Sequence, residues 1–290
     1  MKNLVEKVTV QIVLYEENFE LIKECLINLK GLKVIIIDNK NNFFLKEKLL
    51  SEFSIEKYIL NKKNIGYSRA HNQASKYVNT EYLLILNADC LIDKVSIQTL
   101  INTIEKNKKC GLVSPTTYDN EGNFTYNSGY FPEQGVKSEP LLIDGDVCVN
   151  SVLGSSMLIS KKLFQELDGF DENFFLYFSD DELCKRIKKK KLSVIQSFNS
   201  KAVHIHGISK VESIIKKIFL REFHYTFDQM YYYYKQRIDS NIISRNKKKI
   251  FNYFIKFFIS IIFFKIKKST FYLAKFLAIS KFIRSFKMHL

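Results

Sequence analysis

The sequence contains no tryptophan and little of what marks fibrous, low-complexity or disulfide-stapled proteins. Only 3 of its 290 residues are Pro and 10 are Gly, which excludes collagen-like and Pro/Gly-rich chains. Its 5 cysteines are scattered and form no CxxC pair, which argues against a disulfide framework and a structural zinc site. Isolated thiols of this kind are typical of a reducing, cytoplasmic setting.

Long apolar runs are also missing. No stretch reaches the ~18 uninterrupted apolar residues that indicate a membrane-spanning helix. The most apolar stretch, residues 250–264 (IFNYFIKFFISIIFF), is interrupted by Lys256 and follows three lysines at 247–249. The early run at 8–15 (VTVQIVLY) is too short for the hydrophobic region of a secretion signal, so we expect a β-strand there.

The sequence does have the composition of a chain that buries a core, with 46% apolar and 26% charged residues. Its net charge of +15 is unevenly distributed. Residues 1–209 carry 27 Lys and Arg against 26 Asp and Glu, whereas residues 210–290 carry 18 against 4. A neutral part followed by a basic tail indicates an anionic partner for the tail, either a membrane surface or a nucleic acid.

The first ninety residues alternate between strand-like and helix-like patterns. Strand-like runs lie at 8–15, 34–38, 57–60 and 82–87, and helical spacing of apolar residues lies at 19–29, 43–53 and 66–77. Repeated units of this kind predict an α/β fold with a mostly parallel sheet and helices on both faces. In such sheets ligands bind beyond the carboxyl ends of the strands, so residues just after each strand are the first candidates for a site.

The remaining chain divides into a second half of this domain and a tail. Residues 111–149 are rich in turn formers and predict a loop or a small antiparallel insert. Further elements are expected as a core strand within 151–160, a helix at 161–167, a helix beginning near Asp180, and short strands at 193–196 and 202–206. The composition changes near residue 210, which predicts a domain over 1–210 and a basic, aromatic-rich helical region over 211–290.

Two acidic residues stand at predicted strand ends. Asp38 ends the run VIIID, and Asp89 follows the run YLLILN by one residue. Either carboxylate alone is most simply a helix cap or a turn residue. Both together at one edge of a sheet favour a nucleotide site, in which Asp38 binds the base or ribose and Asp89 holds a divalent cation.

A third acidic point is the pair Asp180 and Asp181, which follows the aromatic run FFLYF. Such a pair is often a solvated first turn of a helix, where acids interact favourably with the helix dipole. Beside aromatic residues that exclude water, it is also a candidate general base. His204 and His206 lie two apart on a predicted strand, where a histidine is either structural or a ligand.

Seven segments in order resemble one known family. They are YEEN (15–18), IIIDN (35–39), NIGYSRAHN (64–72), LLILNAD (83–89), GSSMLI (154–159), GFDENFFLYFSDDELCKRI (169–187) and VHIHGIS (203–209). Together they closely resemble the inverting family 2 glycosyltransferases with the GT-A fold, in particular the rhamnosyltransferase-like branch that builds bacterial surface polysaccharides. The resemblance covers residues 8–209.

The resemblance implies a role for individual residues. The nucleotide and donor would be bound by Tyr15, Asp38, Asn64, Gly66, Arg69, Asn87 and Ala88. Gly154, Ser155 and Phe178 would line the sugar and acceptor side. Asp89 and His204 would hold Mn²⁺ or Mg²⁺, and Asp180 would be the catalytic base, with Asp181 as the second choice.

The sequence departs from the family pattern at three positions. The metal motif reads Asn87-Ala88-Asp89, with one acid only, so that the cation would depend on oxygens of the substrate. Ser179 stands where the family usually has the Glu before its catalytic Asp, which leaves the choice between Asp180 and Asp181 open. Glu16 replaces the usual Asn after the first Tyr.

The implied function is metal-dependent, inverting transfer of a hexose or deoxyhexose from a nucleotide-diphosphate sugar to a glycan or lipid-linked glycan. Spacing of Phe, Ile and Leu among lysines over 245–287 predicts amphipathic helices on an anionic membrane surface, and a short span is the alternative. The expected location is the cytoplasmic face of the bacterial inner membrane, as a peripheral protein.

Three other functions are compatible with parts of the sequence. The basic, tyrosine-rich tail also fits a nucleic-acid-binding protein, although 250–264 is more apolar than such tails usually are and residues 1–209 show no RNA-binding signature, so no nucleic acid is expected. A sugar nucleotidyltransferase or a retaining transferase would share the fold class and differ in the product released.

Overall fold

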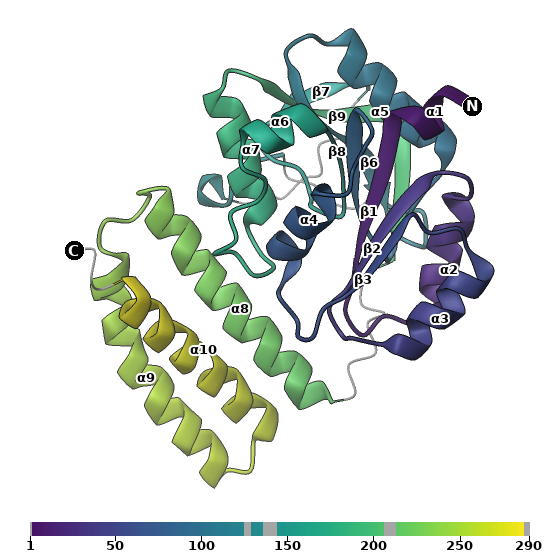
Figure 1. The fold of residues 1–290 in the computed structure, drawn as a ribbon. Coiled ribbons are helices and arrows are strands. Elements are labelled where there is room, and N and C mark those ends of the chain that lie inside the picture. The colour runs from purple at the N-terminus through teal and green to yellow at the C-terminus, as the bar shows by residue number, and fades with distance from the viewer. Residues whose placement is uncertain (1, 125–128, 136–143, 206–212, 287–290) are drawn as a thin grey trace. The chain divides into compact units, whose positions relative to one another are not determined.

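The computed structural model describes residues 2–124, 129–135, 144–205 and 213–286 (Figure 1). The chain forms two compact units. Unit 1 comprises Met1–Glu172 and Ser179–Lys210, and unit 2 comprises Asn173–Phe178 and Val211–Leu290. The six residues 173–178 therefore interrupt unit 1 in sequence and pack with the C-terminal helices.

Unit 1 is built on one mixed nine-stranded sheet. The strand order is β3-β2-β1-β4-β8-β6-β9-β5, and β7 pairs with β9. The strands are β1 Val8–Leu14, β2 Lys33–Asp38, β3 Lys57–Leu60, β4 Tyr82–Asn87, β5 Cys90–Ile92, β6 Cys110–Tyr118, β7 Val147–Val149, β8 Ser156–Ser160 and β9 Ser193–His204.

The first half of the sheet follows the sequence prediction. Strand β1 pairs in parallel with β2 and β4, and β2 pairs in parallel with β3. The carboxyl ends of β1, β2 and β4 therefore share one edge of the sheet, which places Tyr15, Asp38 and Asn87 at that edge. The predicted α/β class is confirmed.

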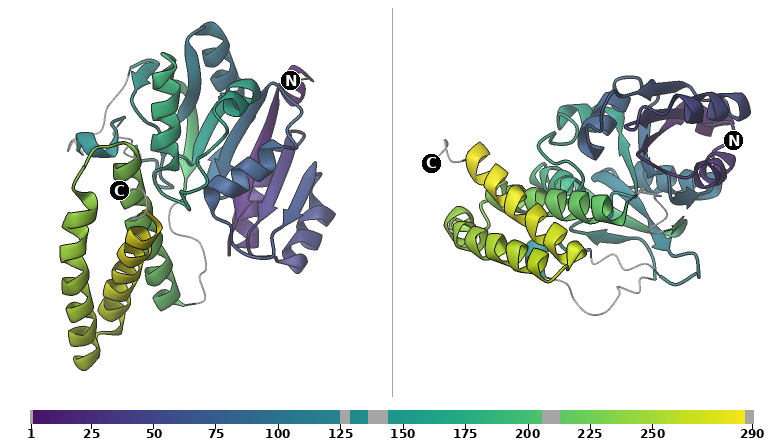
Figure 2. Two further views of the ribbon diagram at one scale, coloured as in Figure 1. Left: turned by 60° about the vertical axis from the view of Figure 1, so that its left-hand side comes forward. Right: turned by 90° about the horizontal axis from the view of Figure 1, so that it is seen from below.

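Helices cover both faces of this sheet (Figure 2). Residues of β2 alternate between the two faces: Ile36 belongs to the core packed by α2, α3 and α5, whereas Ile35 and Ile37 belong to the core packed by α4, α6 and α7. Burial on both faces explains why VIIID is apolar until its last residue. The helices of unit 1 are α1 Lys2–Lys7, α2 Phe19–Asn28, α3 Phe43–Glu52, α4 Tyr67–Ser75, α5 Lys94–Lys106, a 3₁₀ turn at Pro132–Gln134, α6 Lys161–Glu166 and α7 Ser179–Lys189.

The polar residues between strands and helices set where several helices begin. Asn18, Asn42 and Asp93 precede α2, α3 and α5, and the side chain of each accepts a hydrogen bond from a backbone N–H of the first turn. Such caps satisfy N–H groups that have no partner within the helix. They fix short connections at the edge where the strands end.

The second half of the sheet differs from the prediction. Strand β6 covers the start of the segment expected to be a loop or a small insert, and it pairs with β8 antiparallel and with β9 in parallel. The strand could not be recognised from the sequence, because Gly111 and Pro115 are residues that disfavour strands. Its pairing with β9 is correspondingly irregular, between Cys110 and Leu112 and again after Pro115. The two short strands expected at 193–196 and 202–206 are one strand, β9, and His206 lies outside the described residues.

Unit 2 is a bundle of three helices, α8 Ile214–Lys235, α9 Ile242–Ile262 and α10 Ile266–Phe286. The predicted helical C-terminal region is confirmed. Its core is mostly aromatic and includes Phe174, Tyr232 and Phe282, all 1% exposed or less. Phe174 belongs to the segment 173–178, and its ring meets that of Tyr231 edge to face with 4.8 Å between centroids.

The segment 173–178 is held by a buried carboxylate of α8. Asp228 is 0% exposed and accepts hydrogen bonds from the backbone N–H groups of Phe175, Leu176 and Tyr177, at 2.9–3.2 Å. At the start of the same segment, Asn173 donates a hydrogen bond of 3.1 Å to the hydroxyl of Tyr231. These bonds fix the backbone of the six residues against α8.

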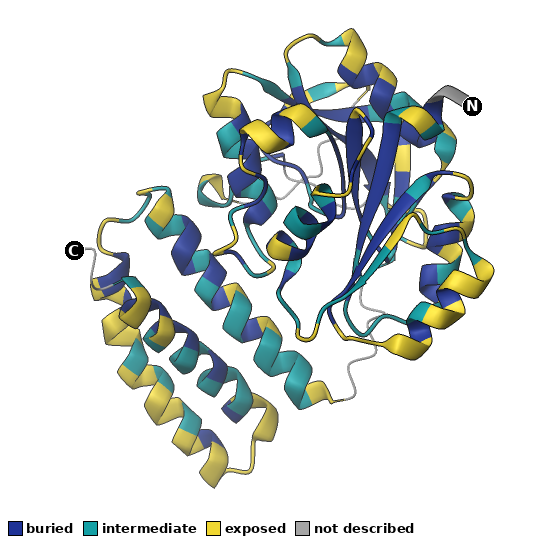
Figure 3. Cartoon of the chain, in the orientation of Figure 1, coloured by how far each residue is buried: buried dark blue, intermediate teal, exposed yellow. Residues whose placement is uncertain are grey.

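Much of α9 is exposed (Figure 3), and apolar residues spaced three and four apart form one of its exposed faces. The exposed side chains include Phe251, Phe254, Ile255, Phe258, Ile259 and Ile262. Among the residues that the structure describes, no helix is both long and apolar enough to span a bilayer.

Candidate active site

Asp38 ends β2 as a fully buried carboxylate. Its oxygens accept hydrogen bonds from the backbone N–H of Lys40 at 2.7 Å and from the hydroxyl of Tyr58 at 3.1 Å. A further, longer bond comes from the backbone N–H of Asn42, just before α3. Asp38 thus stabilises the turn between β2 and α3, which was one of the two roles expected for it. Its role in binding the nucleotide stays a prediction.

A residue that the sequence analysis did not single out lies near Asp38 and Asp89. Burial, together with the charges of Asp89 and Asp38, raises the pKa of the Glu17 carboxyl to about 8. Glu17 also accepts a hydrogen bond from the backbone N–H of Tyr15, at the end of β1. Three carboxyl groups, from the connections after β1, β2 and β4, therefore lie at this edge of the sheet. In the sequence, only the motif YEEN (15–18) indicated Glu17.

Asn64 and Gly66 form the turn that begins α4. The side-chain oxygen of Asn64 accepts the backbone N–H of Gly66 at 2.9 Å, and Gly66 has a φ of 86°, a conformation that favours glycine. The backbone oxygen of Gly66 accepts a bond from the side-chain amide of Asn39, which follows β2. This turn is thereby tied to the edge that holds Asp38.

Arg69 lies three residues further, on α4. It is exposed, and its side chain donates a hydrogen bond of 3.2 Å to the backbone oxygen of Glu172. The carboxylate of Glu172 is also within ion-pair distance. In this structure Arg69 thus contacts the chain just before residue 173, and its role in binding the donor stays a prediction.

Asp89 and His204 are 115 residues apart in sequence and adjacent in space. Nε2 of His204 lies 3.1 Å from Oδ1 of Asp89, and the backbone N–H of Ile205 donates to the backbone oxygen of Asp89. Antiparallel pairing of β5 with β9 brings them together, since Cys90 lies opposite His204. The structure thus brings these two side chains within hydrogen-bond distance, and their role as metal ligands stays a prediction.

This pair fits a divalent cation that takes other ligands from its substrate. A carboxylate oxygen and an imidazole nitrogen both bind Mn²⁺, and Mg²⁺ commonly combines one or two carboxylates with phosphate oxygens. Among the described residues, no group of three or more His, Cys, Asp or Glu side chains could hold a metal by itself. That a cation here would take its other ligands from the substrate, as expected from the single acid of Asn87-Ala88-Asp89, stays a prediction.

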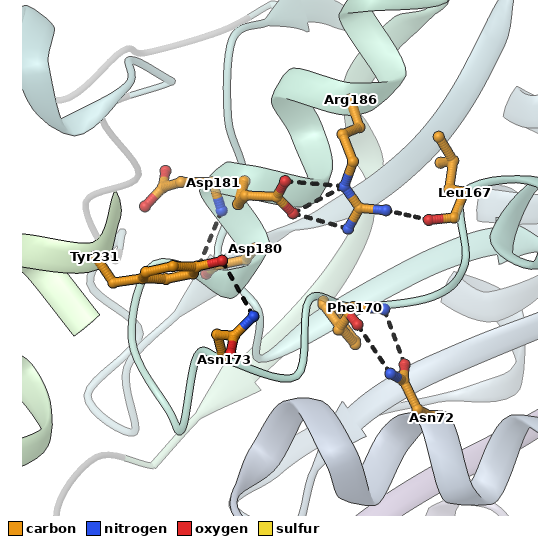
Figure 4. Close-up of polar contacts among 9 residues, drawn as sticks. Asn72, Leu167, Phe170, Asn173, Asp180, Asp181, Arg186 and Tyr231 are labelled. Carbon is orange, nitrogen blue, oxygen red and sulfur yellow. Dashed lines mark hydrogen bonds and ion pairs between the residues drawn. The ribbon is translucent and has the colours of Figure 1, made fainter. Parts of the chain in front are cut away.

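Asp180 and Asp181 stand in the first turn of α7 (Figure 4). Oδ2 of Asp180 accepts the backbone N–H of Gly154 at 2.7 Å, and Oδ1 of Asp181 accepts the hydroxyl of Ser151 at 2.6 Å. Burial raises the pKa of Asp180, and burial together with the charge of Asp180 raises that of Asp181. Both carboxylates are therefore more basic than an ordinary aspartate.

Gly154 sits between Asp180 and a tyrosine that the sequence analysis did not single out. The hydroxyl of Tyr67 donates a 2.6 Å hydrogen bond to the backbone oxygen of Gly154, and burial keeps the pKa of Tyr67 above its usual value, so that this donor stays protonated. A Cβ at residue 154 would lie 3.1 Å from Oδ2 of Asp180 and 3.2 Å from the Tyr67 oxygen. Only glycine fits without displacing one of them.

The loop at Gly154 also reaches the end of β4. The backbone N–H of Asn87 donates 2.9 Å to the backbone oxygen of Ser155. One short path of contacts thus runs from Asp180 through Gly154 and Ser155 to Asn87, two residues before Asp89. The candidate base and the candidate cation site are held by neighbouring parts of unit 1.

Two sets of contacts hold the chain at Leu167 and Phe170, before α7 begins (Figure 4). The side chain of Asn72 exchanges two 2.8 Å hydrogen bonds with the backbone of Phe170. Arg186 on α7 pairs with Glu182 and donates to the backbone oxygen of Leu167. Asp180 and Asp181 thus lie on a helix, α7, that Arg186 ties to the chain at Leu167.

Phe178, predicted on the acceptor side, belongs to unit 2. Its ring packs near those of Tyr225 and Tyr232 on α8, with centroids 5.4 and 5.5 Å apart. Phe178 also has a φ of 63°, the left-handed region that bulky residues rarely adopt. The chain thus turns sharply directly before Ser179 and Asp180.

Comparison with known proteins decides the family. The family model described as "Glycosyl transferase family 2" matches residues 9–168, more than half of the chain. The chain belongs to glycosyl transferase family 2. The match contains the strand ends with Asp38 and Asp89 and the loop at Gly154, and it ends before Asp180 and His204.

By their names, curated relatives of this family 2 glycosyltransferase include a hexosyltransferase of glycan biosynthesis and a rhamnosyl transferase. The chain is 27% identical over 215 residues to the "Low-salt glycan biosynthesis hexosyltransferase Agl10" of Haloferax volcanii, covering 70% of this chain and 68% of the relative. It is 24% identical over 184 residues to the "dTDP-rhamnosyl transferase RfbF" of Shigella flexneri, covering 62% of each chain. The chain thus spans about two thirds of the length of these relatives.

Solved structures show the fold of this glycosyltransferase. A mannosyltransferase of Pyrobaculum calidifontis, solved with GDP-Man and Mn²⁺, superimposes with a TM-score of 0.54 at 15% identity, covering 97% of this chain and 75% of that chain. The GT-A fold implied by the sequence motifs is confirmed.

Proposed function

We propose that this glycosyltransferase performs metal-dependent, inverting transfer of a sugar from a nucleotide-diphosphate sugar to a hydroxyl of a lipid-linked glycan. Bacterial surface polysaccharide is the product we infer, with residues 1–210 as the catalytic domain. The observation that carries this proposal is the contact path from Asp180 through Gly154 to the strand end that precedes Asp89. A basic carboxylate and the Asp89–His204 pair on connected loops of one sheet edge suit a displacement at one anomeric carbon.

The donor would lie along the strand ends of the parallel half-sheet. Tyr15 follows β1, Asp38 ends β2, and Asn64 and Gly66 follow β3. Ligands of such sheets bind at these strand ends. Arg69, Asn87 and Ala88 complete the predicted donor contacts. The names of the relatives favour a hexose or a deoxyhexose as the transferred sugar.

Asp180 is the base in this proposal. It takes the proton of the acceptor hydroxyl while that oxygen forms a bond to the anomeric carbon, and the bond from this carbon to the diphosphate oxygen breaks with its electron pair leaving on the diphosphate. Attack from the side opposite the leaving group inverts the anomeric configuration in one step. A raised pKa supports this role, because a more basic carboxylate accepts the proton more readily.

The Asp89 and His204 side chains would hold the divalent cation, Mn²⁺ or Mg²⁺. Such an ion supplies a Lewis acid that offsets the charge of the departing diphosphate. Their 3.1 Å separation supports a shared ligand. Gly154 and Ser155 would line the sugar and acceptor side, since Gly154 touches Asp180.

We further propose that residues 245–287 bind an anionic membrane surface at the cytoplasmic face of the inner membrane. The exposed apolar face of α9 supports this, because it lies among Lys247, Lys248, Lys249, Lys256 and Lys265, all exposed. Replacement of Phe258 and Ile262 by Glu should abolish binding to vesicles that contain phosphatidylglycerol. Phe44→Glu, at a still more exposed aromatic residue of α3, is the control and should bind normally. Full vesicle binding by the double variant would refute the membrane part.

The main test is a thermal-shift screen of nucleotide sugars with and without Mn²⁺, followed by product analysis with the stabilising donor. We expect stabilisation that depends on both, release of a nucleoside diphosphate, and an inverted anomeric product. Release of diphosphate ion would instead indicate a nucleotidyltransferase, and a retained configuration would exclude the single displacement.

A further inference from the structure

Residues 173–178 belong to unit 2 but lie directly before the candidate base in sequence. Unit 1 pauses at Glu172 and resumes at Ser179, and the six residues between them pack with the C-terminal helices. Asp180 follows Ser179, in the first turn of α7. The backbone that enters this turn therefore comes from unit 2 rather than from unit 1.

Asp228 of α8 binds the middle of this segment. Its carboxylate is 0% exposed and accepts the backbone N–H groups of three successive residues, Phe175, Leu176 and Tyr177, at 2.9–3.2 Å. Burial raises the pKa of the Asp228 carboxyl to about 6, so it is mostly ionised at neutral pH. Hydrogen bonds to an ionised acceptor are stronger than those between neutral groups. One side chain thus holds three backbone donors of the segment.

Both ends of the segment are anchored to the same helix. At its start, Asn173 donates a hydrogen bond of 3.1 Å to the hydroxyl of Tyr231 on α8 (Figure 4). At its end, the ring of Phe178 packs near two tyrosine rings of α8, with centroids 5.4 and 5.5 Å apart. Helix α8 therefore contacts the segment at its start, its middle and its end.

The last residue of the segment has a backbone conformation that its neighbours must maintain. Phe178 has a φ of 63°, in the left-handed region that bulky side chains rarely adopt. Such a conformation persists where the surrounding structure fixes the chain. Asp228 fixes the chain before Phe178, at Tyr177, and the bond from Gly154 to Asp180 fixes it afterwards. Without the bond at Tyr177, Phe178 can relax, and the first turn of α7 shifts with it.

The position of Asp180 is sensitive to a shift of this turn. Its Oδ2 accepts the backbone N–H of Gly154 at 2.7 Å, and Oδ1 of Asp181 in the same turn accepts the hydroxyl of Ser151 at 2.6 Å. Movement of the turn would disturb both bonds. Misplacement of a reacting group by about 1 Å can lower a rate about 10²-fold.

We propose that α8 positions the Asp180 base through residues 173–178, with Asp228 as the positioning residue. By holding residues 175–177, Asp228 sets the turn at Phe178 and with it the start of α7. This inference rests on the proposed function for the role of Asp180. It gives unit 2 a part in catalysis that is independent of the membrane binding proposed for residues 245–287.

Asp228→Asn in the full chain is the first test, and Glu222→Gln is its matched control. Each replaces a buried carboxyl of α8 by an amide of the same size, but Glu222 pairs with Arg221 and Lys275. We expect kcat per folded molecule to fall about tenfold in Asp228→Asn and to stay at the parent value in Glu222→Gln. The KM for the donor should not change, because the proposed donor contacts lie elsewhere. Parent kcat in Asp228→Asn, or an equal loss in Glu222→Gln, would overturn the proposal.

A double-mutant cycle distinguishes positioning from a general structural effect. If Asp228 acts through Asp180, adding Asp228→Asn to Asp180→Asn should not lower the residual turnover further, since the positioned group is already lost. A further tenfold loss in the double variant would show that Asp228 acts by another route, and the proposal would be wrong.

Tyr231→Phe tests the hold of α8 on the segment even where Asp228→Asn does not fold. It removes the hydroxyl that binds Asn173 and keeps the ring. Tyr234→Phe is the control, because the ring of Tyr234 on the same helix packs against Phe282 instead. We expect kcat to fall about threefold in Tyr231→Phe and to stay unchanged in Tyr234→Phe. Parent kcat in both variants would contradict the proposal.

The same kinetics separate this inference from the proposed function. Near-normal turnover in Asp180→Asn would contradict the proposed function, on which the inference rests. A large loss in Asp180→Asn together with parent kcat in Asp228→Asn would leave the proposed function intact and overturn this inference alone.

Discussion

The backbone N–H of Gly154 donates a 2.7 Å hydrogen bond to Oδ2 of Asp180. The two residues come from the loop before β8 and from the first turn of α7, and their contact leaves no room for a side chain at position 154. Tyr67 closes the other side of the loop through its bond to the Gly154 oxygen. The orientation of the candidate base is thus set by a glycine and a tyrosine rather than by another charge.

Gly154→Ala should impair catalysis more than folding. The added Cβ would press on Oδ2 of Asp180 and on the Tyr67 oxygen, so the carboxylate must shift by a few tenths of an ångström. We expect kcat to fall about tenfold or more, since small misplacements of reacting groups reduce rates strongly. Steady-state kinetics and a melting curve check this. A normal kcat in a folded variant would show that the contact does not orient the base.

The pH dependence of activity should report the raised pKa of Asp180. A base acts only when ionised, so kcat/KM should rise with pH and level off above that pKa, which burial places above the ordinary 3.8. Asp181 is also raised, and the two neighbouring carboxylates titrate as a pair. A flat profile from pH 4 to 8 would count against a buried carboxylate base.

The same groups should make stability fall as pH rises through this range. A carboxyl whose pKa is higher in the folded than in the unfolded chain binds its proton more tightly when folded. Its contribution to stability is therefore full below about 3.8 and is lost as pH rises toward the folded pKa. Asp180→Asn, which cannot titrate, should show a weaker decline in chemical denaturation series from pH 4 upward. An unchanged slope would contradict the raised pKa.

Much of the first half of the fold could be predicted from the sequence. Strands β3 and β4 have the predicted bounds, because a short apolar run between polar turns leaves little choice of where the strand begins and ends. Strand β6 could not be found this way, since Gly111 and Pro115 resemble a loop and only its pairing partners β8 and β9 identify it. The long-range partners of a strand are not encoded in its local pattern.

The candidate site could be predicted only in part. The nearness of Asp89 to His204 depends on the pairing of β5 with β9, which only the motif order suggested. Glu17 and Tyr67 lie inside the recognised motifs without an assigned role there. The structure singles them out because both are buried, Glu17 feels the charge of Asp89, and Tyr67 donates a hydrogen bond to Gly154. The membership of 173–178 in unit 2 had no signal in the sequence, since it depends on the partners of Asp228.

Removal of Asp89 or His204, the proposed metal ligands, should affect donor binding only when metal is present. Asp89→Ala and His204→Ala each remove one of the two side chains that lie 3.1 Å apart. We expect each to weaken donor binding about tenfold in Mn²⁺ and to leave binding in EDTA unchanged. Calorimetric titration of the donor in both buffers measures this. Parent-like binding in Mn²⁺ would remove both residues from the metal site.

Asp228 should matter for stability. Asp228→Ala would leave the backbone N–H groups of Phe175, Leu176 and Tyr177 without their acceptor inside unit 2, which costs on the order of 2–4 kcal/mol. Asp228→Asn keeps one acceptor oxygen and should lose less. Urea denaturation of the parent and both variants gives the order of their free energies of unfolding. Equal stability of parent and Asp228→Ala would show that water replaces the carboxylate.

The most direct test of the catalytic assignment compares Asp180→Asn with Asp181→Asn at saturating donor and acceptor. Loss of a general base typically lowers turnover ~10²–10⁴-fold, so Asp180→Asn should lose kcat on that scale with unchanged donor affinity, while Asp181→Asn loses less. Near-normal turnover in Asp180→Asn, with the large loss in Asp181→Asn instead, would contradict the assignment.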